Sequence, residues 1–544
     1  MSSDSGARSR RAAGAWAGLV SAGVALGVAE LAAALLGDGR AAPVFAIGGS
    51  VIDATPRWLK EWAIRSFGTN DKTVLVGSIV VVLVLLALLT GMLAVGNRRV
   101  GLAGVAVLSV VGAVSATTRP GADLRDALPS LLGGLGGAAA LLALLRPLRA
   151  RSDVDTSPTQ VGPRPPPFGV SSRDRAAAYL ANTDRGGASY DRRAFLLTSV
   201  GAVAVGAVAG AAGRSALTKR LDVGASRAAV VLPAPTSPAA PLPPGTDLGL
   251  PGLSPFRTSN RDFYRIDTAL LVPQLSTTDW RLRVHGMVDR EIELDYAALL
   301  ARGVIERDVT LTCVSNEVGG SLVGSARWLG APLADLLRDA GVRPGADQLL
   351  SRSVDGMMIG TPTEVVMDGR DALLAVAMNG EPLPTRHGFP VRMVVPGLYG
   401  YVSATKWVVD LELTRFVDTQ AYWVERGWAL RGPIKTMTRI DTPDGRQQLR
   451  AGRVAVAGVA WAQHRGIEQV EVRVDRGAWQ QARLASVPST DTWRQWVLAW
   501  DATPGEHVIE ARATDATGTP QPQQETDPFP SGATGWPNRT VNVA

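Results

Sequence analysis

Cys313 is the only cysteine among the 544 residues of the chain. It lies in the stretch RDVTLTCVSNEVGG (307–320), where alternating apolar residues indicate a strand and the glycines a following loop. A thiol without a second thiol forms neither an intramolecular disulfide nor a four-cysteine iron–sulfur site. Three alternatives remain for it: an inert core residue, a nucleophile, or a ligand of a soft metal.

Three other stretches accompany the one around Cys313. They are SNRDFYRID (259–267), RHGFPVRMVVPGLYGYVSATKW (386–407) and YWVERGWALRGPIKTMTRID (422–441). Taken singly, His387 could cap a turn, whereas Arg392 and Lys406 could be solvated surface charges. Their occurrence together in one short motif favours a functional role over these structural roles.

The elements that must position these residues mix helices and strands without a regular alternation. DWRLRVHGMV (279–288) alternates as a strand does, and APLADLLRDAGV (331–342) has the spacing of an amphipathic helix that ends at a glycine. The sequence therefore predicts an α+β domain. After residue 438, short alternating strands such as RVAVAGVAWA and IEQVEVRVD are separated by turns and predict an immunoglobulin-like β-sandwich.

The N-terminal region contains five apolar runs, and about 20 such residues cross a membrane. They are Ala12–Leu36, Thr73–Val95, Val100–Ala116, Leu128–Leu145 and Phe195–Gly213. Arginines gather in RSRR before the first run, in NRR (97–99) and in RPLRAR after the fourth, and cationic loops stay in the cytoplasm. This predicts a multi-pass protein of the cell membrane with everything after Gly213 on the extracytoplasmic side.

The segments between these parts also have predicted roles. RWLKEWAIRSFG (57–68) is predicted to lie along the membrane interface. Arg192 and Arg193 precede the fifth run, in an arrangement that resembles a twin-arginine export signal and equally fits ordinary positive-inside flanking. The predicted parts are a four-span region 1–149, a cytoplasmic linker 150–191, a fifth span 192–213, a proline-rich spacer 214–258, the α+β domain 259–438 and the sandwich 439–544.

Charge and histidine content exclude several classes of partner. The formal net charge is +7, but its arginine clusters lie beside apolar runs, which argues against nucleic-acid binding. The four histidines all lie at or after His285, so the membrane region lacks the histidine pair that holds a transmembrane haem. With no haem and no iron–sulfur cluster predicted, a redox role would need an external electron carrier.

The four stretches occur along the chain in the order 259–267, 307–320 with the isolated cysteine, 386–407 and 422–441. In this order they resemble the sulfite oxidase family of molybdenum enzymes. The resemblance extends to the related periplasmic methionine sulfoxide reductase catalytic subunit and covers nearly all of residues 260–544. It implies a molybdenum–molybdopterin cofactor. It also implies that the C-terminal module resembles an immunoglobulin-like domain often used for homodimerisation.

The resemblance implies the residues of the site as well. Cys313 would be the single protein ligand of molybdenum, as a thiolate. Tyr422 is the predicted active-site tyrosine, with Tyr399 and Tyr401 as alternatives. The predicted cofactor-binding residues are Asn260, Arg261, Phe263, Tyr264, Asn316, His387, Arg392, Ser403 and Lys406.

The run after Cys313 departs from the family's pattern. Sulfite oxidases follow their cysteine with a motif like C-x-G-N-R-R, whose arginines help to bind sulfite, whereas this chain has CVSNEVGG. Glu317 and Val318 stand where the arginines would be, which weakens binding of a dianion. Other arginines that could reach the site are Arg265, Arg426 and Arg431. The departure predicts a small-molecule substrate other than sulfite, such as a sulfoxide or another S- or N-oxide.

The sequence thus predicts a membrane-anchored molybdopterin oxidoreductase that transfers an oxygen atom outside the cytoplasm. Electrons would pass to or from a cytochrome or a quinone-linked protein. Two alternatives from other classes are a non-catalytic membrane receptor with an immunoglobulin-like outer module and an enzyme that uses Cys313 as a nucleophile.

Overall fold

A computed structural model describes residues 2–36, 39–56, 59, 62, 71–119, 122–149, 191–221, 223–445 and 448–544. The chain folds as two compact units, Met1–Leu221 (unit 1) and Asp222–Ala544 (unit 2), each with its own buried core. Apart from Asp191, the predicted linker 150–191 lies outside the described residues. So does the predicted interfacial segment 57–68, apart from Leu59 and Trp62.

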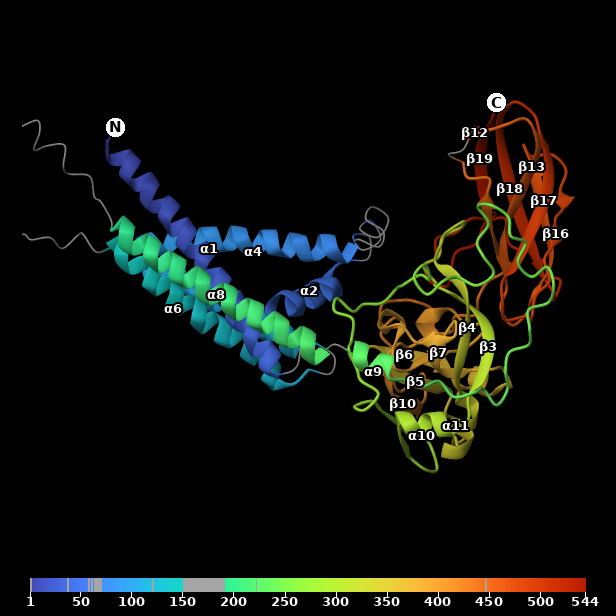
Figure 1. The fold of residues 1–544 in the computed structure, drawn as a ribbon, viewed down its shortest axis with the longest axis horizontal. Coiled ribbons are helices and arrows are strands. Elements are labelled where there is room, and N and C mark those ends of the chain that lie inside the picture. The colour runs from blue at the N-terminus through green and yellow to red at the C-terminus, as the bar shows by residue number, and fades with distance from the viewer. Residues whose placement is uncertain are drawn as a thin grey trace, which may run out of the picture. The chain divides into compact units, whose positions relative to one another are not determined.

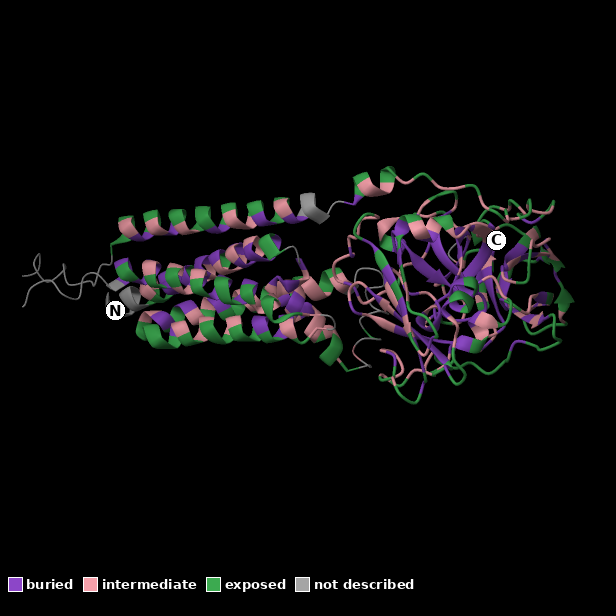
Figure 2. Cartoon of the chain, turned by 90° about the horizontal axis from the view of Figure 1, so that it is seen from below, coloured by how far each residue is buried: buried purple, intermediate pink, exposed green. Residues whose placement is uncertain are grey.

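Unit 1 is a helical bundle (Figure 1). Its elements are α1 (Ser2–Leu36), η1 (Gly39–Ala41), α2 (Pro43–Ala54), α4 (Asp71–Gly96), α5 (Arg98–Thr117), η3 (Leu124–Ala127), α6 (Leu128–Arg149) and α8 (Arg192–Leu221). Among the described residues, five helices are long and apolar enough to cross a membrane, as the sequence predicts. These helices carry many exposed residues (Figure 2). Many of the exposed residues are apolar, for example Leu85 on α4 and Val208 on α8, which suits contact with lipid.

Small residues bring these helices close together. A Cβ atom at Gly18 on α1 would lie 2.0 Å from the carbonyl oxygen of Ala87 on α4, so only glycine permits this crossing. Ser21 on α1 donates a hydrogen bond of 2.6 Å to the carbonyl oxygen of Gly137 on α6. Close backbone approach and interhelical hydrogen bonds stabilise helix association where lipid removes the hydrophobic driving force.

Unit 2 begins with α9 (Gly224–Ala228) and an α+β domain that contains two sheets (Figure 1). One sheet has the order β2 (Ile292–Asp295), β1 (Arg281–Gly286), β10 (Val408–Thr414), β5 (Gln348–Ser353), β6 (Met358–Pro362). The other has the order β3 (Ile305–Thr312), β4 (Val323–Pro332), β7 (Leu373–Met378), β8 (Glu381–Pro382), and β9 (Arg392–Val394) also pairs with β7. The helices are α10 (Tyr296–Ala301), α11 (Leu333–Ala340), α12 (Thr363–Met367), η4 (Thr385–His387) and η5 (Gly400–Val402).

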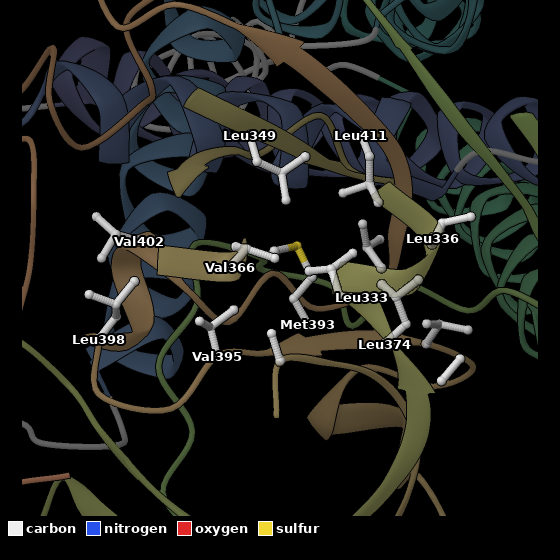
Figure 3. Close-up of a cluster of buried hydrophobic side chains, with 14 of the residues drawn as sticks. Leu333, Leu336, Leu349, Val366, Leu374, Met393, Val395, Leu398, Val402 and Leu411 are labelled. Atoms are coloured by element: carbon white, nitrogen blue, oxygen red, sulfur yellow. The ribbon is translucent and has the colours of Figure 1, made fainter. Parts of the chain in front are cut away.

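The core of this domain lies between the two sheets. Leu349 on β5 and Leu411 on β10 face Leu374 on β7 and Met393 on β9, with Leu333 of α11 between them (Figure 3). All of these side chains are buried. The core fixes β9 with the segment that leads into it from η4, and the loop before β10. The first of these carries the motif HGFPVR (387–392), and the loop carries Lys406.

The C-terminal part is a β-sandwich, as predicted. One sheet contains β11 (Met437–Thr442), β13 (Gly452–Trp461), β17 (Arg494–Ala502) and β16 (Arg483–Leu484). The other contains β12 (Gln448–Leu449), β19 (Asn538–Val543), β18 (Gly505–Asp515), β14 (Ile467–Val474) and β15 (Gln480–Gln481). A shared core, which includes Val456, Trp496, Val472 and Ile509, joins the two sheets.

The proline-rich segment differs from the predicted spacer. It is extended, but it packs along unit 2: Thr236 N–H donates to the carbonyl oxygen of Val304, and Ser237 forms a parallel bridge with Ile305 at the edge of β3. Further on, Leu248 N–H donates to Gln495 of the sandwich at 2.7 Å. Proline removes donors from a segment but leaves carbonyl groups and other amides that can pair with an exposed strand edge.

Candidate functional site

Cys313 follows β3 and is a buried, free cysteine. The loop after it returns to β4 through three hydrogen bonds. Cys313 N–H donates to Leu322 O at 2.9 Å, Asn316 N–H donates to Cys313 O at 3.1 Å, and Leu322 N–H donates to Asn316 Oδ1 at 2.7 Å. Asn316 is itself buried, so its side chain fixes the shape of the loop that presents the thiol.

The surroundings of the sulfur favour a ligand over a nucleophile. Burial raises the pKa of the Cys313 thiol, although the backbone N–H and the hydroxyl of Ser315 donate hydrogen bonds to it and Lys406 adds positive charge. A cysteine nucleophile requires a lowered pKa, and burial acts in the opposite direction. A coordinating metal deprotonates a thiol outright, and the donors of Ser315 would then stabilise the thiolate.

Arg392 on β9 is a buried cation. Its Nη1 donates to the carbonyl oxygen of His387 at 3.2 Å, and its guanidinium group lies 5.0 Å from the ring centroid of Trp328. Burial lowers the pKa of Arg392 to about 10. Among the residues that the structure describes, no carboxylate pairs with it. Because a buried unpaired charge is costly, this arrangement suits an anionic ligand.

Lys406 adds a second cation beside Arg392. Its Nζ donates to Asp267 Oδ2 at 2.5 Å and to Ile266 O at 3.1 Å. Burial lowers the pKa of Lys406 to about 8, with Asp267 acting in the opposite direction and the charges of Arg392 and Arg265 adding to the depression. Arg265 also binds Asp267, at 2.8 Å. Three cations thus share this region with the carboxylate of Asp267.

His387 ends η4 and is fully buried. Its Nε2 lies 2.9 Å from the carbonyl oxygen of Asn260, which can only accept, so Nε2 carries the proton. Burial and the charge of Arg392 lower the pKa of His387 to about 3, which keeps the ring neutral. At Gly388, with φ +112°, a Cβ would lie 3.0 Å from Arg392 Cβ and 3.1 Å from Lys406 Cβ, so glycine permits this close approach.

The segment 259–264 forms one side of the same region. The ring of Phe263 is buried and lies 5.2 Å from that of Tyr264 and 5.7 Å from that of His387. Asn260 Nδ2 donates to Met378 O at 3.0 Å. Burial and the charge of Cys313 raise the pKa of Tyr264, while Arg392 lowers it, so Tyr264 lies within electrostatic reach of both.

Three predicted site residues have other surroundings. The side chain of Arg261 is 92% exposed. Ser403 is buried, and its Oγ donates to the carbonyl oxygens of Leu398 and Tyr399. Tyr422 lies beneath the guanidinium group of Arg426, at 3.4 Å from the ring centroid. Their roles at the cofactor stay predictions.

Tyr399 is a tyrosine alternative whose pKa is influenced by the charge of Cys313. Burial and the charge of Cys313 raise the pKa of Tyr399 to about 12, and its hydroxyl oxygen accepts from Lys435 N–H at 3.4 Å. Sequence reasoning also missed Ser315, Asp267 and Trp328. Only Ser315, two positions after the cysteine, has a local signal that could have revealed it.

This set of groups fits a molybdopterin cofactor. It combines one thiol, a buried arginine, a partly neutralised lysine and a neutral histidine, which suits a metal with one protein ligand and a phosphate-bearing ring. Among the described residues, no group of three or more histidine, cysteine, aspartate or glutamate side chains is placed to hold a metal.

Comparisons with known proteins agree with this chemistry. Residues 269–423 match the family model "Oxidoreductase molybdopterin binding domain". Mitochondrial sulfite oxidase of Drosophila melanogaster is 28% identical over 328 residues, which is 49% of this chain and 56% of that protein. The uncharacterized oxidoreductase YuiH of Bacillus subtilis (strain 168) is 32% identical over 155 residues, 28% of this chain and 75% of that protein.

Among solved structures, the sulfane dehydrogenase SoxCD from Paracoccus pantotrophus matches with a TM-score of 0.44 and 25% identity, covering 50% of this chain and 80% of that chain. The chain spans about half the length of the sulfite oxidases that it matches. It belongs to the sulfite oxidase family of molybdopterin oxidoreductases. Because the members of this family are enzymes, the chain is interpreted as an enzyme and not as a non-catalytic receptor.

Proposed function

We propose that the chain is a membrane-anchored molybdenum–molybdopterin oxidoreductase whose substrate is a neutral or weakly charged S- or N-oxide, such as a sulfoxide, and not sulfite. The reaction takes place outside the cytoplasm. The main support for this substrate class is the loop after Cys313, which supplies no arginine to the region around the thiol. The resemblance to the periplasmic methionine sulfoxide reductase subunit supports the same substrate class.

In this proposal each group of the site has a separate task. Cys313 binds molybdenum as a thiolate, and the bound metal supplies two-electron oxygen-atom transfer. Arg392 and Lys406 hold the pterin phosphate, since Arg392 is buried without a carboxylate among the described residues and the side chain of Lys406 is only 11% exposed. Hydrogen bonds and packing that hold the pterin ring come from Asn260, Arg261, Phe263, Tyr264, Asn316, His387 and Ser403. Tyr422 or Tyr399 is the active-site tyrosine.

The substrate class depends on the cations that are free to meet a dianion. Glu317 is exposed, so its charge points to solvent, and a dianion is disfavoured because the loop supplies no arginine. Of the other candidates, Arg265 pairs with Asp267, Arg426 lies over Tyr422, and Arg431 pairs with Glu364. Burying a dianion without paired cations is costly, whereas a neutral oxide needs only hydrogen-bond donors.

Steady-state turnover with an artificial electron carrier tests the substrate. We expect the purified full chain to reduce a dialkyl sulfoxide and to oxidise sulfite at least about tenfold more slowly, because each uncompensated charge contact weakens binding by about 1.4 kcal/mol or more. The Cys313→Ser protein serves as the blank. Sulfite oxidation at micromolar KM with inert sulfoxides would refute the proposal.

Orientation can be tested separately. The arginines before α1, between α4 and α5 and after α6 support a cytoplasmic location for these ends, and five spans would then put unit 2 outside. We expect alkaline phosphatase fused after Ala544 to be active. A fusion after Asn97 is the control and should be inactive. Activity in the opposite pattern contradicts the proposed side of the membrane.

Electron supply and assembly complete the proposal. A cytochrome or a quinone-linked carrier exchanges electrons with the site, and the β-sandwich forms a homodimer contact. The alternative of a cysteine nucleophile is less well supported, because burial raises the pKa of the Cys313 thiol. In this proposal Arg192 and Arg193, at the start of α8, have one of two roles. They direct export of a folded unit 2, or they are ordinary cytoplasmic residues that flank the span.

A further inference from the structure

Unit 1 contains a cavity of about 100 Å³ among α1, α2, α4, α5 and α6. Most of its lining is alanine, leucine, isoleucine and valine, for example Ala22 and Ala29 on α1, Leu83 on α4 and Leu108 on α5. The volume is of the order of one six-membered ring, since an apolar cavity of about 150 Å³ accepts benzene. A lipid-soluble ring is therefore the kind of ligand that the space accommodates.

A helix that does not cross the membrane forms one wall of this cavity. The apolar α2, Pro43–Ala54, is 12 residues long, whereas about 20 are needed to span the hydrocarbon core. Pro43 and Ile47 of α2 line the cavity. The space is therefore bordered by a short helix as well as by long ones.

The cavity also presents a hydroxyl group with unused hydrogen-bonding capacity. Ser130, in the first turn of α6, lines the cavity and is 3% exposed, and its Oγ has no hydrogen-bond partner among the residues that the structure describes. The other lining serines differ, since Ser21 donates to Gly137 O and Ser109 donates to Val105 O. Buried polar atoms without partners are rare in folded proteins, and a ligand acceptor atom would satisfy this one.

We propose that this cavity binds the ring of an isoprenoid quinone, with Ser130 donating a hydrogen bond to a ring carbonyl oxygen. The apolar lining suits the ring and the start of its tail, and the hydroxyl suits the carbonyl. A lipid acyl chain would fill the same space but would leave Ser130 without an acceptor. The choice of a redox ligand rests on the proposed function, which requires an electron carrier.

Equilibrium binding to the full chain in quinone-free nanodiscs tests the site. The probes are decylubiquinone and a naphthoquinone with the same decyl tail, quantified after separation from free quinone. We expect at least one of them to bind saturably and Ser130→Ala to weaken that binding about tenfold, because one hydrogen bond is removed. As matched controls, Ser109→Ala and Ser199→Ala should bind as the natural chain does. Ser199, on α8, is another buried serine whose Oγ has no hydrogen-bond partner within the described part of the chain.

A second variant addresses the space itself. Ala22→Phe should fill the cavity and abolish binding while the protein stays monodisperse. Equal affinity in Ser130→Ala and the natural chain, or recovery of phospholipid alone from the purified protein, would overturn the proposal. Binding needs neither molybdenum nor turnover. Sulfoxide reduction without quinone binding would therefore contradict this inference alone, and quinone binding without any oxidoreductase activity would contradict the proposed function alone.

Discussion

Cys313→Ser is expected to abolish turnover while unit 2 remains folded. A serine oxygen is a harder and weaker donor to molybdenum than a thiolate, so the redox chemistry should fail first. The substitution is nearly isosteric, and the loop is held by the backbone of Cys313 and by Asn316. The pterin phosphate should remain bound, since Arg392 and Lys406 do not depend on the sulfur.

The measurement combines turnover with molybdenum and pterin content per chain. A graded control is Ser315→Ala, which keeps the proposed ligand but removes one of its two donors from Ser315. Loss of a group that supports a metal ligand typically lowers activity about 10- to 100-fold, so this variant should be impaired but active. Undiminished turnover in Cys313→Ser would exclude Cys313 as the ligand.

Arg392→Met is expected to have opposite effects on the cofactor-free and the loaded protein. Without cofactor, Arg392 is a buried cation that no described carboxylate neutralises, so its removal should raise the free energy of unfolding by about 1–3 kcal/mol. Methionine can keep contact with Trp328, because it replaces the stem of the side chain. In the loaded protein, the loss of charge-assisted hydrogen bonds should weaken cofactor retention roughly 10- to 100-fold.

Two measurements separate these effects. Tryptophan fluorescence reports the melting of unit 2 in full chain made without molybdopterin, and pterin content after dialysis reports retention. Arg386→Met is the matched control, since Arg386 lies on the same motif but is exposed, and it should change neither value by much. A destabilised cofactor-free protein with unchanged pterin retention would assign Arg392 a purely structural role.

The five membrane helices and the two parts of unit 2 follow from the sequence because their signals are local. An apolar run of sufficient length crosses a membrane whatever surrounds it, and the period-2 alternation before Cys313 places the thiol at a strand end. The spacing of His387, Gly388, Arg392 and Lys406 within one motif likewise marks the site before any fold is known.

Other features could not be predicted because they depend on residues far apart in the chain. The short α2, its cavity and the unused hydroxyl of Ser130 result from the packing of five helices. Periodicity does not distinguish a proline-rich spacer from an extended segment paired to β3, since both have the same backbone geometry. The exposure of Glu317 and the position of Tyr399 near Cys313 depend equally on the surrounding fold.

The sequence by itself determined which residue types this protein brings to its site: one thiol, two cations and a histidine in recognisable motifs. Only the tertiary structure decided their chemical state. His387 is neutral because it is buried beside Arg392 and donates to Asn260, 127 positions earlier, and Arg392 has a lowered pKa because the fold surrounds it with apolar groups. Residue identity is a local property, whereas the loss of water around a charge is produced by the whole domain.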